Sequence, residues 1–390
     1  MPWKVCTPMS QRLEFILQAK QGGLSFSELC RRHKISRTTG YKWLRRHGTL
    51  GDPGLADRSR KPLNSPEITD PDISRAILEL RTKHPAWGAR KLRAVLEREH
   101  PEQTWPAPST VHAVLKRSGC IDPDEGARHK AFISFERPQP NELWQMDFKG
   151  DIPTRNGRCH PFTCLDDHSR FNLILQACKN QQESTVSAAL SAAFRRYGLP
   201  DAILADNGGP WGGCGYHTYT RLSLWLMRLD VRLIHGRPFH PQTQGKDERF
   251  HRTLLLELLS RNIWRDLDHC QSEFDPWRDV YNFVRPHQSL DMKTPGLVYR
   301  PSTRSFPESL PPIVYPDHDV VRNGRNAGRL RFQGRNYKIP LSFAGLPLAL
   351  RPTTTDGLWH VYFCRFHVLT LNQRSSDQPV KIIGNPSRSS

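Results

Sequence analysis

The first third of the chain carries hydrophobic residues at helical spacing, interrupted by short polar stretches. In residues 1–50 the pattern predicts three short helices, and Ser36 is placed to cap the third of them. Tyr41 and Leu44 are expected to face the interior of this unit. The tight connection before Ser36 is typical of a helix-turn-helix, so we expect a DNA-binding domain, with a small helical bundle of basic surface as the alternative.

A second helical unit is predicted over residues 67–122, after a basic linker at residues 51–66. Ile73, Ile77 and Leu80 recur at the spacing of one helix face, and two further helices follow them. We expect this unit to be a second helix-turn-helix domain. The linker has the composition either of an extended arm that lies in a minor groove or of a solvated spacer.

After residue 141 the pattern changes to alternation of hydrophobic and polar residues. Trp144, Met146 and Phe148 alternate with polar neighbours, as expected of a strand with one buried face. Three such strands are followed by helices and strands in turn, which predicts an α/β core over residues 136–308. The expected strands lie near residues 143–152, 159–166, 171–178, 202–206 and 231–235, and the expected helices near 183–197, 216–229, after 245 and within 273–300.

Short alternating segments separated by glycines characterise residues 309–375. Leu330 and Phe332 alternate with arginines, which places hydrophobic side chains on one face of a strand and charge on the other. The pattern predicts a small β-barrel with a basic outer face. Residues 376–390 are polar and are expected to be a disordered tail. The fold class expected for the chain is therefore multidomain, with all-α N-terminal units, an α/β core and a C-terminal β-barrel.

Positive charge is concentrated towards the two ends of the chain, whose 390 residues carry a formal net charge of +19. Residues 1–135 hold 24 Lys or Arg against 14 Asp or Glu, and residues 310–390 hold 11 against 4. Residues 136–309 are nearly balanced, with 22 against 20. This distribution indicates basic nucleic-acid-binding modules on either side of a nearly neutral centre.

Features of a secreted or membrane protein are not expected. The first residues lack the apolar stretch of a signal peptide, and the longest apolar run falls short of a membrane span. The nine cysteines follow no disulfide-framework spacing, which favours reduced thiols. We therefore expect a cytoplasmic, nucleoid-associated protein that does not enter a membrane.

Three acidic residues occupy positions suited to metal-assisted phosphoryl transfer. Asp147 lies on the polar side of the first strand, and Asp206 ends an apolar run just before a glycine turn. Glu248 lies in the first turn of a helix. That helix is expected to bury a stripe formed by Phe250, Leu254 and Leu258. Carboxylates from three elements provide oxygen ligands for a pair of divalent cations, whereas Asp166 and Asp167 are expected to form a turn between strands.

The segments around these acids resemble those of insertion-sequence transposases of the Asp-Asp-Glu type, which are related to retroviral integrases. The resemblance is carried by Trp-Gln-Met-Asp at residues 144–147, Ala-Asp-Asn-Gly at 205–208 and His-Pro-Gln-Thr-Gln-Gly-Lys-Asp-Glu-Arg-Phe-His at 240–251. Tyr-Asn-Phe-Val-Arg-Pro-His at residues 281–287 and Thr-Pro at 294–295 fit the same group. The likeness extends over nearly the whole chain.

Two features depart from the pattern of that group. Asp206 and Glu248 are 42 positions apart, a longer interval than usual, which we attribute to an insertion in the glycine-rich segment 208–215. Asp247 stands where a small apolar residue is usual. The choice of Glu248 over Asp247 therefore rests on the register of the motif.

The resemblance implies a ribonuclease H-like catalytic core and a C-terminal Src-homology-3-like barrel that binds DNA. It also implies a transposase that binds transposon terminal inverted repeats, cleaves the phosphodiester at each end and joins the 3′-OH to target DNA by in-line transesterification. Asp147, Asp206 and Glu248 would act as the catalytic residues and hold two Mg²⁺ or Mn²⁺ ions. The expected partners are double-stranded DNA, both transposon ends and target, and further copies of the chain on paired ends.

Side chains expected to contact DNA lie in each basic segment. Lys246 and Arg249 are expected to bind the DNA backbone, and Arg285 and His287 to reach DNA from a later helix. His251 is expected to be structural or a helper. The remaining predicted contacts are Arg37, Thr38, Thr39, Lys42, Arg45, Arg58, Arg60, Lys61, Lys116, Arg117, Arg331 and Arg335.

Two other functions are compatible with the same sequence. A sequence-specific regulator with an inert nuclease-like core would use the same helix-turn-helix units but would show no metal-dependent cleavage. A nuclease that cuts without joining would use the same acids. Only the detection of strand-transfer products distinguishes that nuclease from a transposase.

Overall fold

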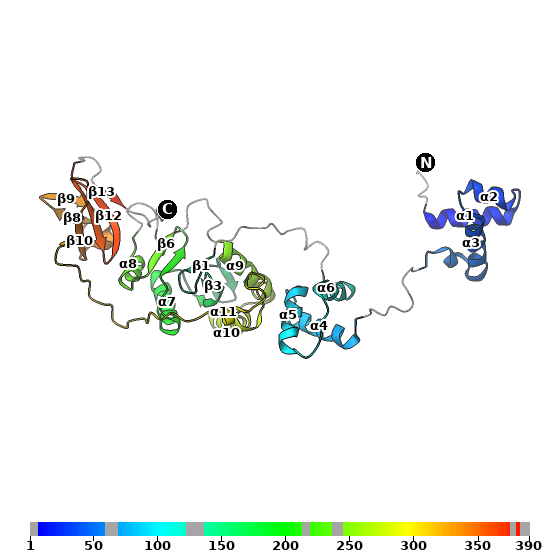
Figure 1. Ribbon diagram of the computed structural model, residues 1–390, viewed down its shortest axis with the longest axis horizontal. Coiled ribbons are helices and arrows are strands. Elements are labelled where there is room, and N and C mark those ends of the chain that lie inside the picture. The colour runs from blue at the N-terminus through cyan, green and yellow to red at the C-terminus, as the bar shows by residue number, and fades with distance from the viewer. Residues whose placement is uncertain are drawn as a thin grey trace. The chain divides into compact units, whose positions relative to one another are not determined.

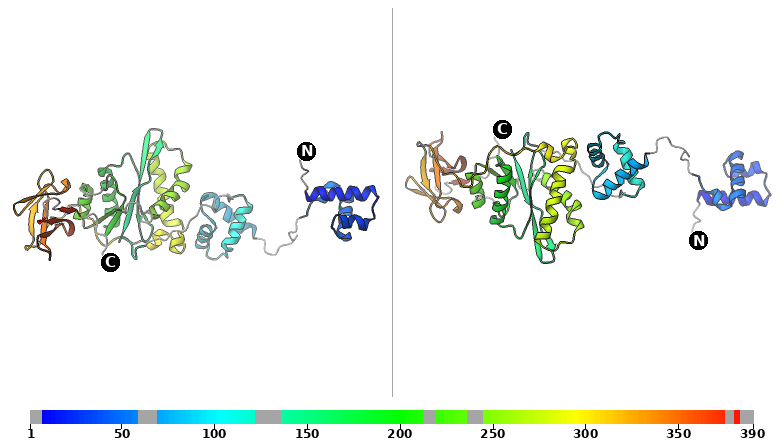
Figure 2. Two further views of the ribbon diagram at one scale, coloured as in Figure 1. Left: turned by 90° about the horizontal axis from the view of Figure 1, so that it is seen from above. Right: turned by 90° about the horizontal axis from the view of Figure 1, so that it is seen from below.

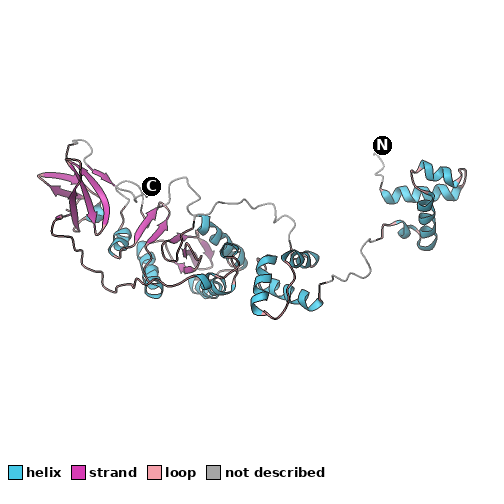
Figure 3. Cartoon of the chain, viewed as in Figure 1, coloured by secondary structure: helices cyan, strands magenta, loops and turns pink. Residues whose placement is uncertain are grey.

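The computed structural model describes residues 7–58, 69–121, 136–212, 219–235, 245–374 and 380–382. The chain divides into two compact units, Met1–Ile68 and Thr69–Ser390. In the described ranges every regular element before residue 122 is helical, and the first strand begins at Trp144 (Figure 3). The predicted DNA contacts Arg60 and Lys61 fall outside the described residues.

The described residues of the first unit, 7–58, form three α-helices and a short 3-10 helix (Figure 1). Ser36 caps the third helix, because its side chain accepts a hydrogen bond from the Thr39 backbone N–H at 3.1 Å. This cap confirms the start predicted for that helix. The elements are α1 (Pro8–Gln21), α2 (Phe26–Arg32), α3 (Arg37–Leu50) and η1 (Asp52–Leu55).

The buried face of α3 differs from the predicted one. Gly40 lies against the side chains of Phe26 and Cys30, so close that no Cβ would fit without a shift. Trp43, one turn later, is also buried. Tyr41 is 53% exposed, and its prediction as an inward-facing residue is therefore wrong. The Tyr41 ring lies on the rim of the contact with α2, where its centroid is 4.2 Å from that of Phe26.

The second unit begins with a bundle of three helices. Asp70 caps the first of them by accepting a hydrogen bond from the Asp72 backbone N–H at 2.7 Å. The helices are α4 (Pro71–Lys83), α5 (Ala89–Glu99) and α6 (Pro108–Arg117). Their shared core consists of Ile77, Trp87, Leu92, Val95, Leu96, Trp105, Val111, Val114 and Leu115.

A mixed six-stranded sheet forms the centre of the second unit, with strand order β2-β3-β1-β5-β6 and β4 paired to β3. β3 is antiparallel to β1, β2 and β4, whereas β5 is parallel to β1 and β6 is parallel to β5. The strands are β1 (Trp144–Phe148), β2 (Ile152–Thr154), β3 (Gly157–Asp166), β4 (Asn172–Cys178), β5 (Ala202–Ala205) and β6 (Arg232–His235). Strands first, and then strands alternating with helices, is the order that the sequence predicted.

The first predicted strand, residues 143–152, is two strands in the structure. Gly150 adopts a positive φ of 93°, which ends the extended backbone of β1 and lets the chain turn into β2. β2 then pairs with the beginning of β3, with Ile152 opposite Cys159. The hydrophobic alternation of the segment gave no sign of this break.

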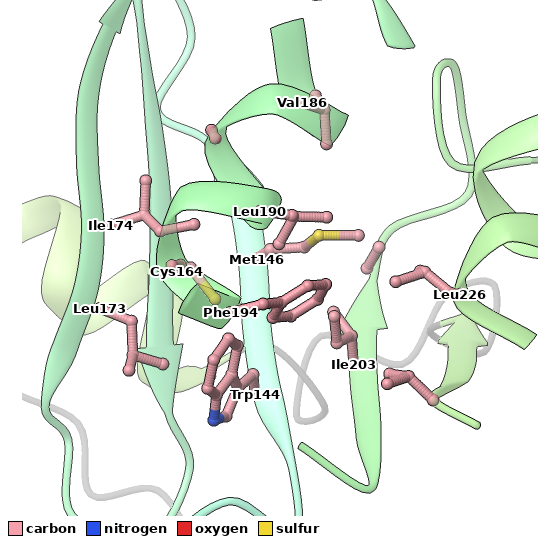
Figure 4. Packing of buried hydrophobic residues seen from close by; sticks show 14 of the residues in the cluster. Trp144, Met146, Cys164, Leu173, Ile174, Val186, Leu190, Phe194, Ile203 and Leu226 are labelled. Carbon is pink, nitrogen blue, oxygen red and sulfur yellow. The ribbon is translucent and has the colours of Figure 1, made fainter. Parts of the chain in front are cut away.

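Helices cover both faces of the sheet (Figure 2). On one face, α7 (Glu183–Tyr197) and α8 (Arg221–Arg228) pack on the strands. Figure 4 shows this core, in which the Phe194 ring lies 5.6 Å from that of Trp144, measured between centroids. The alternation of β1 explains the face, because Trp144 and Met146 both point into this cluster.

The opposite face of the sheet is covered by α9 (Gly245–Glu257) and α10 (Leu267–Asp279). The stripe predicted for α9 is confirmed, since all three of its residues are buried against the sheet. These residues are Phe250, Leu254 and Leu258. The chain continues through a π-helical turn, a 3-10 turn and a short helix, which are Val280–Val284, Gln288–Leu290 and α11 (Pro295–Val298).

The C-terminal part of the second unit contains two antiparallel sheets, one of five strands in the order β13-β12-β11-β10-β7 and one of β8 and β9. As predicted, Leu330 and Phe332 are buried and the arginines between and before them are exposed. The hydrogen-bonded path of the described strands does not close, so the predicted barrel is not seen. The strands are β7 (Val320–Asn323), β8 (Arg329–Phe332), β9 (Arg335–Lys338), β10 (Pro347–Pro352), β11 (Leu358–Phe363), β12 (Phe366–Asn372) and β13 (Val380–Ile382).

No helix in the described ranges is both long enough and apolar enough to cross a bilayer.

Candidate active site

Asp147 and Asp206 lie at the carboxyl ends of two adjacent parallel strands. In the pairing of β1 with β5, Trp144 is opposite Ile203. Continuing this register places Asp147 opposite Asp206, on neighbouring strands about 4.8 Å apart. Because side chains alternate along a strand, both carboxylates leave the sheet on the face opposite Trp144 and Ile203. Two acids predicted from separate segments are therefore neighbours.

The surroundings of Asp147 oppose its ionisation. Burial, and in second place the negative charge of Asp206, raise the pKa of Asp147 to about 6. The Phe148 backbone N–H donates a hydrogen bond to Asp147 Oδ1 at 2.7 Å, which lowers this pKa in part. A carboxyl group perturbed both by burial and by a second acid is typical of functional sites.

Asp206 is held by two neighbouring rings. The Trp211 side chain donates a hydrogen bond to its carboxylate, and His235 Nδ1 lies 3.0 Å from its backbone oxygen. Burial nevertheless raises the pKa of Asp206. In the part of the chain that the structure describes, Asp206 Oδ1 is buried without a hydrogen-bond partner. Such an oxygen is destabilising unless a bound group satisfies it.

Trp211 is a residue of this site that the sequence analysis missed. It belongs to the glycine-rich segment that was expected to be a simple insertion. The side chain is 2% exposed and packs on Phe148 and Phe162, with ring centroids 5.7 Å and 5.9 Å away. A large aromatic residue inside a glycine-rich loop, five positions after an acid, is the signal that could have found it.

His251 lies beside Asp147 on the α9 side of the sheet. Its Nε2 is 2.8 Å from Thr163 Oγ1, and its Nδ1 is 3.8 Å from Asp147 Oδ2. The Thr163 hydroxyl donates to the Asp147 backbone oxygen at 2.9 Å, so the ring nitrogen facing Thr163 is the donor of that pair. Burial lowers the pKa of His251 to about 3, which leaves the imidazole neutral near pH 7.

The first turn of α9 places two adjacent acids in different surroundings. Asp247 is buried, because it shares the inward stripe of Phe250. Burial raises the pKa of Asp247 well above its ordinary value, and the charges of Asp147 and Asp167 add to the effect. Glu248, the acid assigned to the metal site, is exposed. One residue along an α-helix is a rotation of about 100°, which explains the difference.

Two of the three predicted metal-binding acids are thus brought together. Among the described residues, no three His, Cys, Asp or Glu side chains are arranged to hold a metal ion. Glu248, the third predicted acid, lies on the exposed side of α9. Asp147 and Asp206 fit a divalent cation: both offer oxygen ligands, the charge of Asp206 opposes the ionisation of Asp147, and Asp206 Oδ1 is buried without a hydrogen-bond partner among the described residues.

Asp166 and Asp167 end β3 and are both buried. Asp166 accepts hydrogen bonds from the backbone N–H groups of Asn141 and Ser169, each at 2.7 Å, which confirms its predicted role in a turn. Asp167 Oδ1 lies 2.6 Å from Lys246 Nζ. Lys246, expected to contact the DNA backbone, is therefore paired within the protein.

Most of the other predicted DNA contacts are exposed. On α3, Tyr41 and Leu44 share one surface groove with Thr38, Thr39, Lys42 and Arg45. Exposed basic side chains also occur in the other predicted segments, namely Arg37, Arg58, Lys116, Arg117, Arg249, Arg331 and Arg335.

Arg285 and His287 do not reach the surface, and the expectation that they contact DNA is wrong. Both are buried, and Arg285 Nε lies 2.9 Å from Glu257 Oε1 at the end of α9. Burial, followed by the charge of Arg285, lowers the pKa of His287 to about 2. These side chains join α9 to the segment after α10, which places them inside the packing of the core.

Family models cover most of the chain. Two models described as integrase core domain match residues 137–241 and 229–295, and the C-terminal domain of IS481 family transposases matches residues 319–378. A helix-turn-helix domain matches residues 11–62, and a homeodomain-like domain matches residues 39–115. The chain therefore carries an integrase core between helix-turn-helix domains and a transposase C-terminal domain.

Curated relatives of the chain include two proteins of insertion elements. The uncharacterized 31.7 kDa protein of insertion element IS407 from Burkholderia multivorans is 25% identical over 242 residues, which are 59% of this chain and 82% of the relative. The uncharacterized 39.2 kDa protein of IS476 from Xanthomonas euvesicatoria is 26% identical over 250 residues, 62% of this chain and 69% of the relative.

Solved structures with detectable likeness include retroviral integrases. A chain of the simian T-cell lymphotropic virus intasome in complex with PP2A regulatory subunit B56 gamma is 18% identical, with a TM-score of 0.37, over 77% of this chain and 99% of that one. The HTLV-2 integrase catalytic core domain in complex with magnesium, in its dimeric form, is 14% identical, with a TM-score of 0.31, over 41% of this chain and 97% of that one.

Proposed function

We propose that this chain, an insertion-sequence transposase with an integrase-like core, binds transposon terminal inverted repeats, cleaves the DNA at each end and joins the ends to target DNA. In the first step water attacks the phosphorus at a transposon end, and the P–O bond to the 3′ oxygen breaks to leave a 3′-OH and a 5′-phosphate. In the second step that 3′-OH attacks a target phosphorus, and the 3′ oxygen of the target strand leaves. Neither step needs a covalent intermediate with the protein.

The neighbouring carboxylates of Asp147 and Asp206 are the observation that carries this proposal. They lie within residues 137–241, the range matched by an integrase core domain model. Their electrostatic environment favours a bound cation over two free carboxylates, because burial and the charge of Asp206 oppose the ionisation of Asp147, and Asp206 Oδ1 is buried without a partner in the described structure. A purely structural role would leave these features without a compensating interaction.

Asp147, Asp206 and Glu248 are proposed to hold two Mg²⁺ or Mn²⁺ ions. Such ions supply the positive charge that activates an attacking oxygen and stabilises a leaving oxygen in an in-line displacement. Trp211 orients the Asp206 carboxylate through its hydrogen bond. His251 lies against both Thr163 and the Asp147 carboxylate. Glu248 completes the set when its exposed side chain turns towards the strand ends.

The exposed basic side chains are proposed to bind double-stranded DNA. The groove of α3 would meet the terminal repeat, whereas Arg249 lies on the same helix as Glu248 and would meet the DNA backbone near the reacting phosphate. Joining two transposon ends to one target requires at least two such sites. We therefore expect copies of this chain to assemble on paired ends in the cytoplasm, on the nucleoid.

Cleavage and strand transfer by the full chain test the proposal. The substrate is a duplex carrying the inverted repeat that borders the DNA encoding this chain, with Mg²⁺ or Mn²⁺ as the only divalent ion. Asp147→Asn, Asp206→Asn and Glu248→Gln should each abolish cleavage and joining while leaving duplex binding intact. Asp247→Asn is the matched control and should retain activity.

Three outcomes would contradict the proposal in different ways. Metal-dependent cleavage without strand-transfer products would identify a nuclease. Binding of the repeat without cleavage under either metal would identify a regulator with an inert core. Activity that survives Glu248→Gln but not Asp247→Asn would transfer the third position of the site from Glu248 to Asp247.

A further inference from the structure

The first turn of α9 is tied to the protein by a buried ion pair. Lys246 Nζ lies 2.6 Å from Asp167 Oδ1 and 3.1 Å from the Asp167 backbone oxygen. The side chain of Lys246 is 13% exposed and that of Asp167 only 1%. Lys246 therefore directs its charge into the fold although it lies in a basic segment of the chain.

Asp167 is itself fixed to the strand that carries Asp147. Gln145 Nε2 donates to Asp167 Oδ1 at 2.6 Å, and the Arg137 backbone N–H donates to Oδ2 at 2.8 Å. Gln145 precedes Asp147 by two residues on β1, so both side chains lie on the same face of the sheet. A continuous set of polar contacts thus runs from β1 through Asp167 to Lys246.

Lys246 precedes Glu248 by two residues in α9. Holding the Lys246 ammonium against Asp167 limits both the sliding and the rotation of this turn along the sheet. The neighbouring Arg249 and Arg252 are exposed on the same helix and are free of this pairing. Lys246 thus points into the fold, whereas Arg249 and Arg252 point outward and expose their charge at the surface, where a DNA backbone could bind.

We propose that the Lys246–Asp167 pair is a positioning device, which places the first turn of α9, and with it Glu248, beside the ends of β1 and β5. Lys246 and Asp167 act through the helix and touch neither DNA nor the reacting atoms. This inference rests on the proposed function, because it assigns a purpose to the placement of Glu248. It replaces the role in DNA binding that the sequence suggested for Lys246.

Cleavage kinetics and salt dependence distinguish the two roles of Lys246. In the full chain, Lys246→Met and Asp167→Asn should each lower kcat for cleavage about 100-fold, as expected for a misplaced catalytic group, with KM for the repeat duplex unchanged. Their double variant should lose no more than the worse single variant, because both changes break one contact. Lys246→Arg keeps the charge and should recover part of the rate.

Arg249→Met is the matched control on the same helix. It should lower the slope of log K against log salt concentration by about 0.9, the value for one phosphate contact. Lys246→Met should leave that slope as in the wild type. Scanning calorimetry of each variant checks that the core still unfolds in a cooperative transition, and Asp167→Asn decides the question if Lys246→Met does not fold.

The outcomes separate this inference from the proposed function. A wild-type chain without cleavage under Mg²⁺ or Mn²⁺ overturns both. A wild-type chain that cleaves, together with a Lys246→Met variant of unchanged kcat and reduced salt slope, overturns the positioning role alone and restores Lys246 as a DNA contact. Multiplying losses in the double variant would also overturn it, because they would show that the two side chains act separately.

Discussion

Replacing Asp247 by alanine should stabilise the catalytic core, although most substitutions of buried residues destabilise a protein. The Asp247 side chain is buried, its Oδ1 has no hydrogen-bond partner among the described residues, and Asp147 and Asp167 oppose its charge. A buried polar group without a partner destabilises the fold by about 1–3 kcal/mol, and Asp247→Ala removes it. The substitution also loses the interaction of an acid with a helix N-terminus, about 0.3–1 kcal/mol. The expected net gain is about 1–2 kcal/mol.

This gain should grow as the pH rises. The pKa of Asp247 is raised in the folded state, mainly by burial. Between the unfolded and folded pKa values, the folded chain keeps a proton that the unfolded chain has released, so the stability of the wild type falls as pH increases. Asp247→Ala lacks this titration. The difference in unfolding free energy between Asp247→Ala and the wild type should therefore be small near about pH 4, the ordinary pKa of an aspartate, and larger near about pH 7.

Scanning calorimetry of the full chain measures the effect. For a domain of this size, about 2–4 °C in transition temperature corresponds to each kcal/mol. Glu248→Ala is the control in the same turn, and its exposed side chain should change stability by no more than about 0.5 kcal/mol. An unfolding temperature of Asp247→Ala at or below that of the wild type, or a difference that does not vary with pH, would refute the assignment of Asp247 as a buried and unpaired acid.

Three further substitutions test other parts of the core. The pKa of His287 in the folded state is lowered to about 2, so its contribution to wild-type stability is present above the unfolded pKa and is lost as pH falls below that value. His287→Gln should therefore reduce the acid-induced loss of stability measured by calorimetry. An unchanged pH dependence would contradict the burial of a neutral imidazole. Arg285→Met removes the guanidinium partner of Glu257, so urea denaturation should show a loss of about 3–5 kcal/mol in the free energy of unfolding. Glu257→Leu in the same chain should restore part of that loss. A loss below about 1 kcal/mol would contradict a buried Arg285–Glu257 pair. Trp211→Phe keeps the ring stacking but removes the hydrogen-bond donor to Asp206. The affinity for Mn²⁺, measured by calorimetric titration, should fall about 10–100-fold. Equal affinity would show that this hydrogen bond does not orient the Asp206 carboxylate.

Much of the fold follows from local pattern. The alternation of Trp144 and Met146 predicted β1 and its buried face, and the stripe of α9 was predicted from the spacing of its hydrophobic residues. The cap of α3 by Ser36 was also predicted from residue type and position. These features depend on neighbours within one or two turns of the chain, which is the range over which sequence periodicity carries information.

Features that depend on distant contacts were not predicted. Gly40 makes the close contact of α3 with α2, whereas Tyr41 packs on Phe26 and stays exposed. Arg285 is buried because Glu257 offers a partner from another helix. Closure of the C-terminal sheets was expected from turn glycines, but closure depends on how the strand edges meet rather than on any one turn. Trp211 was overlooked because its role appears only when the loop folds back on β1 and β3.

The sequence predicted Asp147 on the polar side of one strand and Asp206 at the end of another. The structure puts these two strands side by side and parallel, a pairing that strand patterns alone do not specify. The choice between Asp247 and Glu248 could not be made from composition, since both are acids in the first turn of one helix. Their phase relative to the buried stripe separates them, and the structure gives Asp247 the inward phase.

The concentration of acids at this edge of the sheet has a physical consequence. The charge of Asp206 opposes the ionisation of Asp147, and that of Asp147 opposes the ionisation of Asp247, while Lys246, which favours the charged form of Asp247, is paired with Asp167. A fold selected for stability alone would replace such acids by hydrophobic residues or pair them with arginine. The described structure retains an unsatisfied oxygen on Asp206 and on Asp247, and a divalent cation with oxygen ligands is a group that would satisfy such oxygens at the proposed site.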